Sequence, residues 1–280
     1  MPLFDIPEAP EYHLANAPLA QALAQVRYPL LAGLETMAGI APLQETLRTE
    51  FPYMEQEKVQ EVSLVVGPAG PAGGASAESV TWKLTNDAGT MIVIGAGSAS
   101  LSAGDSYTSV VDFAADFDRL LWALAAANVP RCDRLGVRYL SLASDLPGED
   151  RSWRRWFKPE LLGWTGSEAV PDGALRTSIN QVTLNHRPVG DLAGPPGEIE
   201  ATIRHGAVPA GTTVPGIPPL QVAEPSYLLD LDVYVVGPQP FEPGAIGEQF
   251  ALFHDQIDRF FYWSLTRKGA EHFGLEIRDS

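Results

Sequence analysis

Cysteine, basic charge and long apolar runs are all scarce in this sequence. A single cysteine, Cys132, occurs among 280 residues, so the chain can form neither an internal disulfide nor a cysteine-based zinc cluster. No apolar stretch reaches the roughly 18 residues of a membrane span, and the N-terminal residues lack the basic start and apolar run of a signal peptide. We therefore predict a cytoplasmic protein that does not enter a membrane.

Positive charge is outnumbered by negative charge in the chain as a whole. There are 19 lysines and arginines against 35 aspartates and glutamates, which gives a formal net charge of −16. Such a surface repels phosphate backbones and anionic lipids, and it is compatible with basic regions of other proteins. We therefore expect a protein partner, with a homo-oligomer as an open alternative, and we do not expect nucleic acid.

Motifs of catalysis and cofactor binding are absent from the sequence. It contains no Gly-x-Ser-x-Gly and no P-loop. The segment from Ile94 to Ser100 includes Gly95 and Gly97, but it lacks the third glycine of a dinucleotide fingerprint and is predicted to continue as a strand. The sequence thus predicts no catalytic residue, no metal and no cofactor, and it favours a protein that is not an enzyme.

Three small groups of polar residues stay open as exceptions. His254 and Asp258 are spaced i, i+4 on a predicted helix, where they can orient one another as a base and its partner or make a structural contact. His186 and His205 can face each other across adjacent strands. Cys132 has arginines nearby in the sequence, which alone does not make a thiol nucleophilic.

Hydrophobic periodicity predicts an alternation of strands and helices after an irregular segment over 1–18. Strands are expected over 22–31, 59–66, 80–84, 91–101, 135–142, 177–184, 198–204 and 227–236. Helices are expected over 31–51, from Asp105 or Ser106 to Asn128, over 151–162 and over 246–266. Long loops are expected over 67–77, 163–172, 187–196 and 208–225.

Two short matches suggest that this order is an internal duplication. Val-Arg-Tyr occurs at 26–28 and again at 137–139, and an apolar-Asp-Arg-apolar-apolar pattern occurs at 117–121 and 257–261. The half-repeats would span 19–130 and 131–280 within one compact domain. The predicted fold class is α+β, with each β-α-β-β-β-α unit contributing to one curved antiparallel sheet that has helices on one face. This arrangement resembles the duplicated saddle of the TATA-box-binding-protein-like fold.

The same stretches resemble a known family. Ala17-Pro18-Leu19, the two Val-Arg-Tyr strands, Tyr107 with Phe113, and the helix from Phe250 with His254 are similar to a sporadically distributed bacterial family of uncharacterised proteins of about this length. The resemblance implies no activity, no cofactor and no catalytic residues. The family's patchy distribution implies a link to bacterial defence or mobile genes.

Two arginines and their neighbouring tyrosines are the first candidate binding residues. Arg27 with Tyr28 and Arg138 with Tyr139 lie at matching positions of the two predicted repeats. As a pair, the arginines would present a bidentate site for an anion. The alternative is that each pairs with a carboxylate, such as Asp118 or Asp258, and fixes strand register.

A basic and aromatic octet at 151–158 is the second candidate. As a helix, it would place aromatic residues on one face and basic residues on another. The surface reading makes it a protein contact patch, since arginine and tryptophan are enriched in interface hot spots, or a stacking and phosphate site for single-stranded nucleic acid. The other reading packs the aromatics on the sheet and leaves the basic face solvated. The candidate contact residues are Trp153, Arg154, Arg155, Trp156 and Lys158.

These observations predict a non-catalytic, cytosolic protein-interaction module. It would bind through the sheet face or through the 151–158 segment, as an accessory or antitoxin-like component of a defence or mobile locus. The alternative is a sensor or hydrolase for a small anionic ligand such as a nucleotide, held by Arg27 and Arg138 in a pocket between sheet and helices.

Overall fold

The computed structural model is α+β, with one large sheet and two small ones. It describes residues 3–67, 70–146, 151–171, 174–186 and 197–277, and only the backbone of 59–67, 70–78 and 186. The order of strands in the large sheet is β3-β4-β5-β6-β2-β7-β12-β9-β8. Its strands are β2 (Leu19–Arg27), β3 (Tyr53–Gly67), β4 (Gly70–Thr85), β5 (Met91–Gly95), β6 (Ser98–Ala103), β7 (Arg131–Ser144), β8 (Ser178–His186), β9 (Ile199–Val208) and β12 (Ser226–Pro240).

The structure has fewer α-helices than strands, and two of the α-helices are short. They are α1 (Met37–Leu47), α2 (Val110–Ala126), α3 (Pro159–Leu162), α4 (Pro243–Ser264) and α5 (Arg267–His272). Single turns of 3-10 helix are η1 (Ala32–Glu35), η2 (Ser152–Arg155) and η3 (Gly163–Gly166). No helix among the described residues combines the length and the apolar character needed to cross a membrane.

The chain divides into two compact units. Unit 1 comprises 1–23, 136–237 and 248–280, and unit 2 comprises 24–135 and 238–247. The predicted duplication is not confirmed, because the first half contains five strands of the large sheet and the second contains four. The extra strand arises at 96–97, where the predicted single strand over 91–101 turns back on itself as the β5–β6 hairpin.

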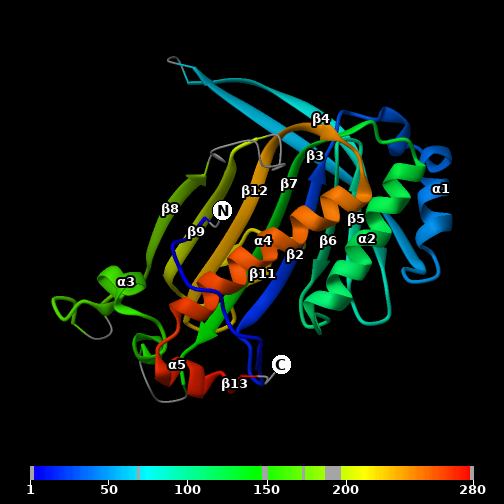
Figure 1. The fold of residues 1–280 in the computed structure, drawn as a ribbon. Coiled ribbons are helices and arrows are strands. Elements are labelled where there is room, and N and C mark those ends of the chain that lie inside the picture. The colour runs from blue at the N-terminus through cyan, green and yellow to red at the C-terminus, as the bar shows by residue number, and fades with distance from the viewer. Residues whose placement is uncertain (1–2, 68–69, 147–150, 172–173, 187–196, 278–280) are drawn as a thin grey trace. The chain divides into compact units, whose positions relative to one another are not determined.

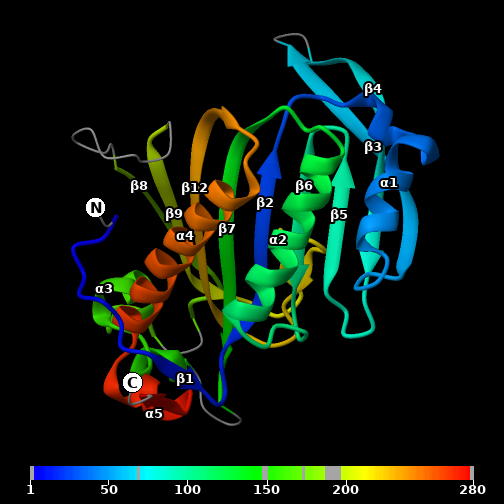
Figure 2. The same ribbon diagram turned by 45° about the vertical axis from the view of Figure 1, so that its right-hand side comes forward.

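Unit 2 is built on the meander β3-β4-β5-β6, in which each strand is antiparallel to the next. Trp82, Ile92 and Leu101 are almost fully buried, and Trp82 Nε1 donates a hydrogen bond to the carbonyl of Leu34 at 2.6 Å. Helices α1 and α2 lie beside these strands (Figure 2). The predicted helix over 105–128 exists, but it begins after Ser109, whose hydroxyl accepts from the amide of Asp112.

The glycine-rich segment at 70–77 does not form the predicted loop, and residues 68–69 of that loop lie outside the described residues. Residues 70–77 belong to β4 and pair with β3 in a long antiparallel hairpin (Figure 1). Composition misled the prediction because ladder hydrogen bonds come from the backbone, which glycine and alanine supply as well as larger residues. The helix predicted over 31–51 is also divided, with η1 before α1, and Pro42 lies within α1.

Unit 1 has a four-stranded segment whose two faces differ. Helix α4 lies over one face in both views (Figures 1 and 2), where Ile257 packs beside Ile203 and Leu231. Residues one step along each strand point to the opposite face, because side chains alternate. On that opposite face Asp230 lies directly across from Arg204, and Arg204 from Gln181.

A flap from residues 209–225 covers one end of this opposite face. It contains the short strands β10 (Thr213–Val214) and β11 (Leu220–Gln221). Its apolar side chains pack on β7, β9 and β12 in a small second core, made by Leu140, Val208, Val214, Val222 and Leu228. The predicted loop at 208–225 is therefore an ordered cover, whereas the loop at 187–196 lies outside the described residues.

The N-terminal segment is also less irregular than predicted. Strand β1 (Tyr12–Leu14) pairs with β13 (Leu275–Ile277). Tyr12 also contacts α4, because its hydroxyl donates a hydrogen bond to Asp258 at 2.7 Å. The N-terminal residues therefore belong to the structure of unit 1.

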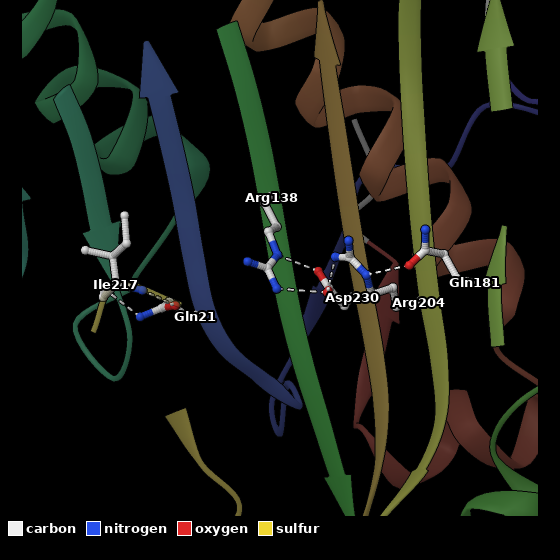
Figure 3. Close-up of polar contacts among 6 residues, drawn as sticks. All are labelled: Gln21, Arg138, Gln181, Arg204, Ile217 and Asp230. Carbon is white, nitrogen blue, oxygen red and sulfur yellow. Dashed lines mark hydrogen bonds and ion pairs between the residues drawn. The ribbon is translucent and has the colours of Figure 1, made fainter. Parts of the chain in front are cut away.

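The flap is attached to β2 by one buried side chain, Gln21. Its Nε2 donates to the carbonyl of Ile217 at 2.7 Å, and its Oε1 accepts from the amide of Ile217 at 3.2 Å (Figure 3). Nε2 also donates to the carbonyl of Pro218 at 3.2 Å. We expect Gln21→Ala to lower the free energy of unfolding by about 2 kcal/mol, because it removes a buried side chain that makes three hydrogen bonds to the flap. Limited proteolysis should then cleave within 209–225 faster than in the wild type. Cleavage at an unchanged rate would show that the apolar contacts alone hold the flap.

Candidate functional site

The strongest polar feature of unit 1 is a row of four side chains across β7, β12, β9 and β8 (Figure 3). Arg138 binds Asp230 with two parallel hydrogen bonds, Nε to Oδ1 at 2.6 Å and Nη2 to Oδ2 at 2.9 Å. Arg204 Nη1 donates to Asp230 Oδ2 at 3.2 Å, and Arg204 Nε donates to Gln181 Oε1 at 2.9 Å. We call Arg138, Asp230, Arg204 and Gln181 the polar row.

The exposed fraction of the side chains differs along the polar row and is smallest at Asp230. The side chain of Asp230 is 1% exposed, that of Arg138 is 18% exposed and that of Arg204 is 39% exposed. A carboxylate buried this deeply needs its charge balanced, and two guanidinium groups supply the balance. Burial tends to lower the pKa of Arg138, but the hydrogen bonds and charge of Asp230 outweigh it and raise that pKa. By formal charge, the two arginines and one aspartate of the row sum to one net positive charge.

The two predicted arginines have different environments. Arg138 pairs with a carboxylate, as one of the two readings expected, but its partner is Asp230 and not Asp258. Arg27 is exposed at the end of β2, where its Nε donates to Gln25 at 3.2 Å. Arg27 belongs to unit 2 and Arg138 to unit 1.

Both neighbouring tyrosines have structural partners. Tyr28 is 4% exposed, and its hydroxyl donates to the carbonyl of Gly95 at 2.8 Å. Burial raises the pKa of Tyr28, so the hydroxyl stays protonated. Tyr139 Oη lies 3.0 Å from His254 Nδ1, on the face of β7 that meets α4.

The aromatic side chains of 151–158 are core residues. Trp153 and Trp156 are each 3% exposed and Phe157 is 1% exposed. Trp156 stacks on His272 with ring centroids 3.9 Å apart, and Phe157 stacks on Tyr227 at 4.9 Å. The reading of Trp153 and Trp156 as partner contacts is therefore corrected, because their surfaces are already covered within unit 1.

The basic residues of this segment also have partners in the fold. Arg154 Nε donates to the carbonyl of Thr165 at 2.5 Å, and Lys158 Nζ lies 4.6 Å from the ring centre of Trp263. Arg155 is an exposed residue, and its backbone carbonyl accepts a hydrogen bond from Thr266 Oγ1. The predicted helix over 151–162 is two short pieces instead, because Pro159 restricts Lys158 to an extended conformation and starts α3 anew.

His205 belongs to a buried hydrogen-bonded chain that the sequence did not reveal. Tyr227 donates to the carbonyl of Leu161 at 2.6 Å, and His205 Nδ1 lies 3.0 Å from the same tyrosine oxygen. Since that hydroxyl hydrogen is used, Nδ1 must carry the hydrogen shared with Tyr227. Burial lowers the pKa of His205, which therefore stays neutral. His205 does not face His186, because the register places Asn180 opposite His205 and Ile199 opposite His186.

The remaining polar candidates are half-buried or inert. Burial lowers the pKa of His254 and raises that of Asp258, and each residue also hydrogen-bonds a tyrosine, Tyr139 and Tyr12 respectively. These contacts link β7, α4 and β1 within unit 1. Cys132 is fully buried, and burial raises the pKa of its thiol to about 11.

No group of three metal-binding side chains comes together among the residues whose positions are described. A depression between Phe4, Ile203 and Ile257 has no room for a water-sized molecule. Among the described side chains of unit 1, the polar row is therefore the candidate site.

Removing the charge at the centre of the polar row should be costly. Asp230→Asn leaves two guanidinium groups without their counter-charge, so we expect the free energy of unfolding to fall by about 3–5 kcal/mol. Glu45→Gln, which breaks an exposed ion pair with Arg48, should cost less than about 1 kcal/mol. Urea denaturation of both variants checks this. Equal losses would mean that the row contributes no more than a surface ion pair.

His205 should make stability depend on pH. Its pKa is lower in the folded state than the value near 6.5 of an unfolded histidine, so its contribution is complete above about pH 6.5. As pH falls below that value the unfolded chain binds the proton first, and the free energy of unfolding decreases. We expect His205→Gln to show a smaller decrease between pH 7 and 5 in urea titrations. A decrease as large as the wild type's would assign the pH dependence to other groups.

Comparison of the chain with protein-family models, with curated proteins and with solved structures finds no match. The family resemblance and the saddle-like fold therefore stay predictions.

Proposed function

We propose that the chain is a non-catalytic protein-interaction module that binds its partner on the face of unit 1 opposite α4, beyond the flap. The observation that carries the proposal is the polar row, which is fixed at Asp230 and reaches the surface at Arg204. The 151–158 segment no longer competes for this role, since its aromatic side chains are buried. A role in defence or mobile loci rests on the family resemblance alone.

The shape of this face favours a protein over a small ligand. Three successive rungs of the ladder beyond the flap carry polar side chains, at Asp230, Asp232 and Tyr234 and at their partners on β9 and β8. Small ligands are usually bound in concave sites that bury most of their surface. A strand ladder that offers polar side chains over three rungs suits a broad protein contact better.

The charges of the face favour a protein over a nucleic acid. Asp232 and Glu200 lie one and two rungs from the positive polar row, and Glu200 Oε2 accepts from Tyr234 at 2.6 Å. A polyanion would meet these carboxylates, whereas a protein can place opposite charges against each group. Arginine is also enriched among residues that dominate binding energy, and Arg204 is the half-exposed arginine of the row.

Native mass spectrometry of the tagged protein, purified gently from its own host, tests the proposal. We expect a mass that includes a second polypeptide. Arg204→Gln should weaken that complex on the order of tenfold, since it removes a charge from the contact. Arg267→Gln is the matched control, because Arg267 is exposed on α5 away from the row.

Each outcome has a separate meaning. A second polypeptide that is lost only in Arg204→Gln supports the face as the binding site. A polypeptide retained equally by both variants contradicts that assignment. A small-molecule mass instead of a polypeptide favours the anionic-ligand alternative, with Arg138 and Arg204 as the residues that hold it.

A further inference from the structure

Strand β8 ends the large sheet and pairs on one side only. Its nine residues are antiparallel to β9, and among the residues that the structure describes no strand hydrogen-bonds to its other side. A free edge of this kind presents unpaired backbone amides and carbonyls to any strand that reaches it. Proteins usually block such edges with charge, proline or short length.

The two end strands of the sheet differ in this protection. β3 contains four charged residues within its first nine, namely Glu55, Glu57, Lys58 and Glu61. β8 reads Ser-Ile-Asn-Gln-Val-Thr-Leu-Asn-His, with no lysine, arginine, acid or proline. The edge at β8 therefore lacks the charge, the proline and the short length that prevent pairing.

Apolar side chains are exposed on both faces of β8. Ile179 is 51% exposed and shares the face of the polar row, whereas Val182 is 43% exposed on the face that meets α4. Trp164, 64% exposed, lies nearby, because the adjacent Gly163 packs against Asn180 of β8. A strand added at this edge would cover apolar surface as well as satisfy backbone groups.

We propose that the occupant of this edge is β8 of a second copy of the chain. Two copies related by a twofold axis pair antiparallel, and the register that uses all nine residues places Val182 opposite Val182 of the second copy. Gln181 then faces Thr183, and Ile179 faces Asn185. Each copy carries a net charge of −16, so a charge-free strand is where two copies meet without direct repulsion. This inference does not depend on the partner face proposed above.

Analytical ultracentrifugation of the purified chain tests the pairing. We expect a dimer of about twice the 30.1 kDa chain mass. Val182→Lys sets two like charges opposite each other at the axis, so its dimer dissociation constant should rise on the order of tenfold or more. Val111→Lys changes a more exposed valine on α2 and should leave the dimer unchanged. Melting temperatures of both variants show whether each is folded.

A cross-link tests the register. Val182→Cys should give a disulfide-linked dimer under mild oxidation, since directly opposed residues of paired strands are close enough for that bond. Val111→Cys should not, and the native Cys132 is buried. A wild-type monomer at all concentrations overturns the inference. So does a dimer that persists in folded Val182→Lys and fails to cross-link at residue 182, because two copies would then meet elsewhere.

Discussion

Unit 1 is organised around the need to neutralise one buried carboxylate. Asp230 lies on β12 with almost no exposed surface, so it requires cations from both neighbouring strands. Arg138 on β7 and Arg204 on β9 supply them, and the three strands are thereby held in one register. A one-residue slip would turn either arginine to the face that meets α4, where Ile203 and Leu231 are packed.

Some elements of the fold could be predicted from local apolar spacing, whereas others depend on pairing between distant residues. Long amphipathic helices were predictable, since the apolar spacing of α2 and α4 reflects a face that must be buried whatever the partner. The central strands were predictable for the same reason. The β4 segment and the β5–β6 hairpin were missed because small residues leave no periodic pattern, while the backbone pairing that makes them strands is long-range.

The partners of the candidate site residues were harder to predict from the sequence than the strands and helices. An arginine in a strand predicts a carboxylate partner, but 92 residues separate Arg138 from Asp230, and sequence alone cannot choose between that acid and Asp258. The octet at 151–158 has the composition of both an interface and a core. Only its contacts with Tyr227 and His272 decide between them, and those contacts need the tertiary fold. The sequence of β8 shows nine residues without a charged side chain. This feature indicates an unprotected edge only once the fold places β8 at the end of the sheet.

The way the flap is attached has a consequence for how its sequence can change over time. Gln21 binds only backbone atoms of the flap, so most flap side chains can be replaced without loss of those hydrogen bonds. Gly216 is the exception, because a Cβ at that position would lie 2.2 Å from Gln21 Oε1. Substitutions should therefore accumulate freely across the exposed residues of 209–225 and be purged at two positions, one in the flap and one on β2.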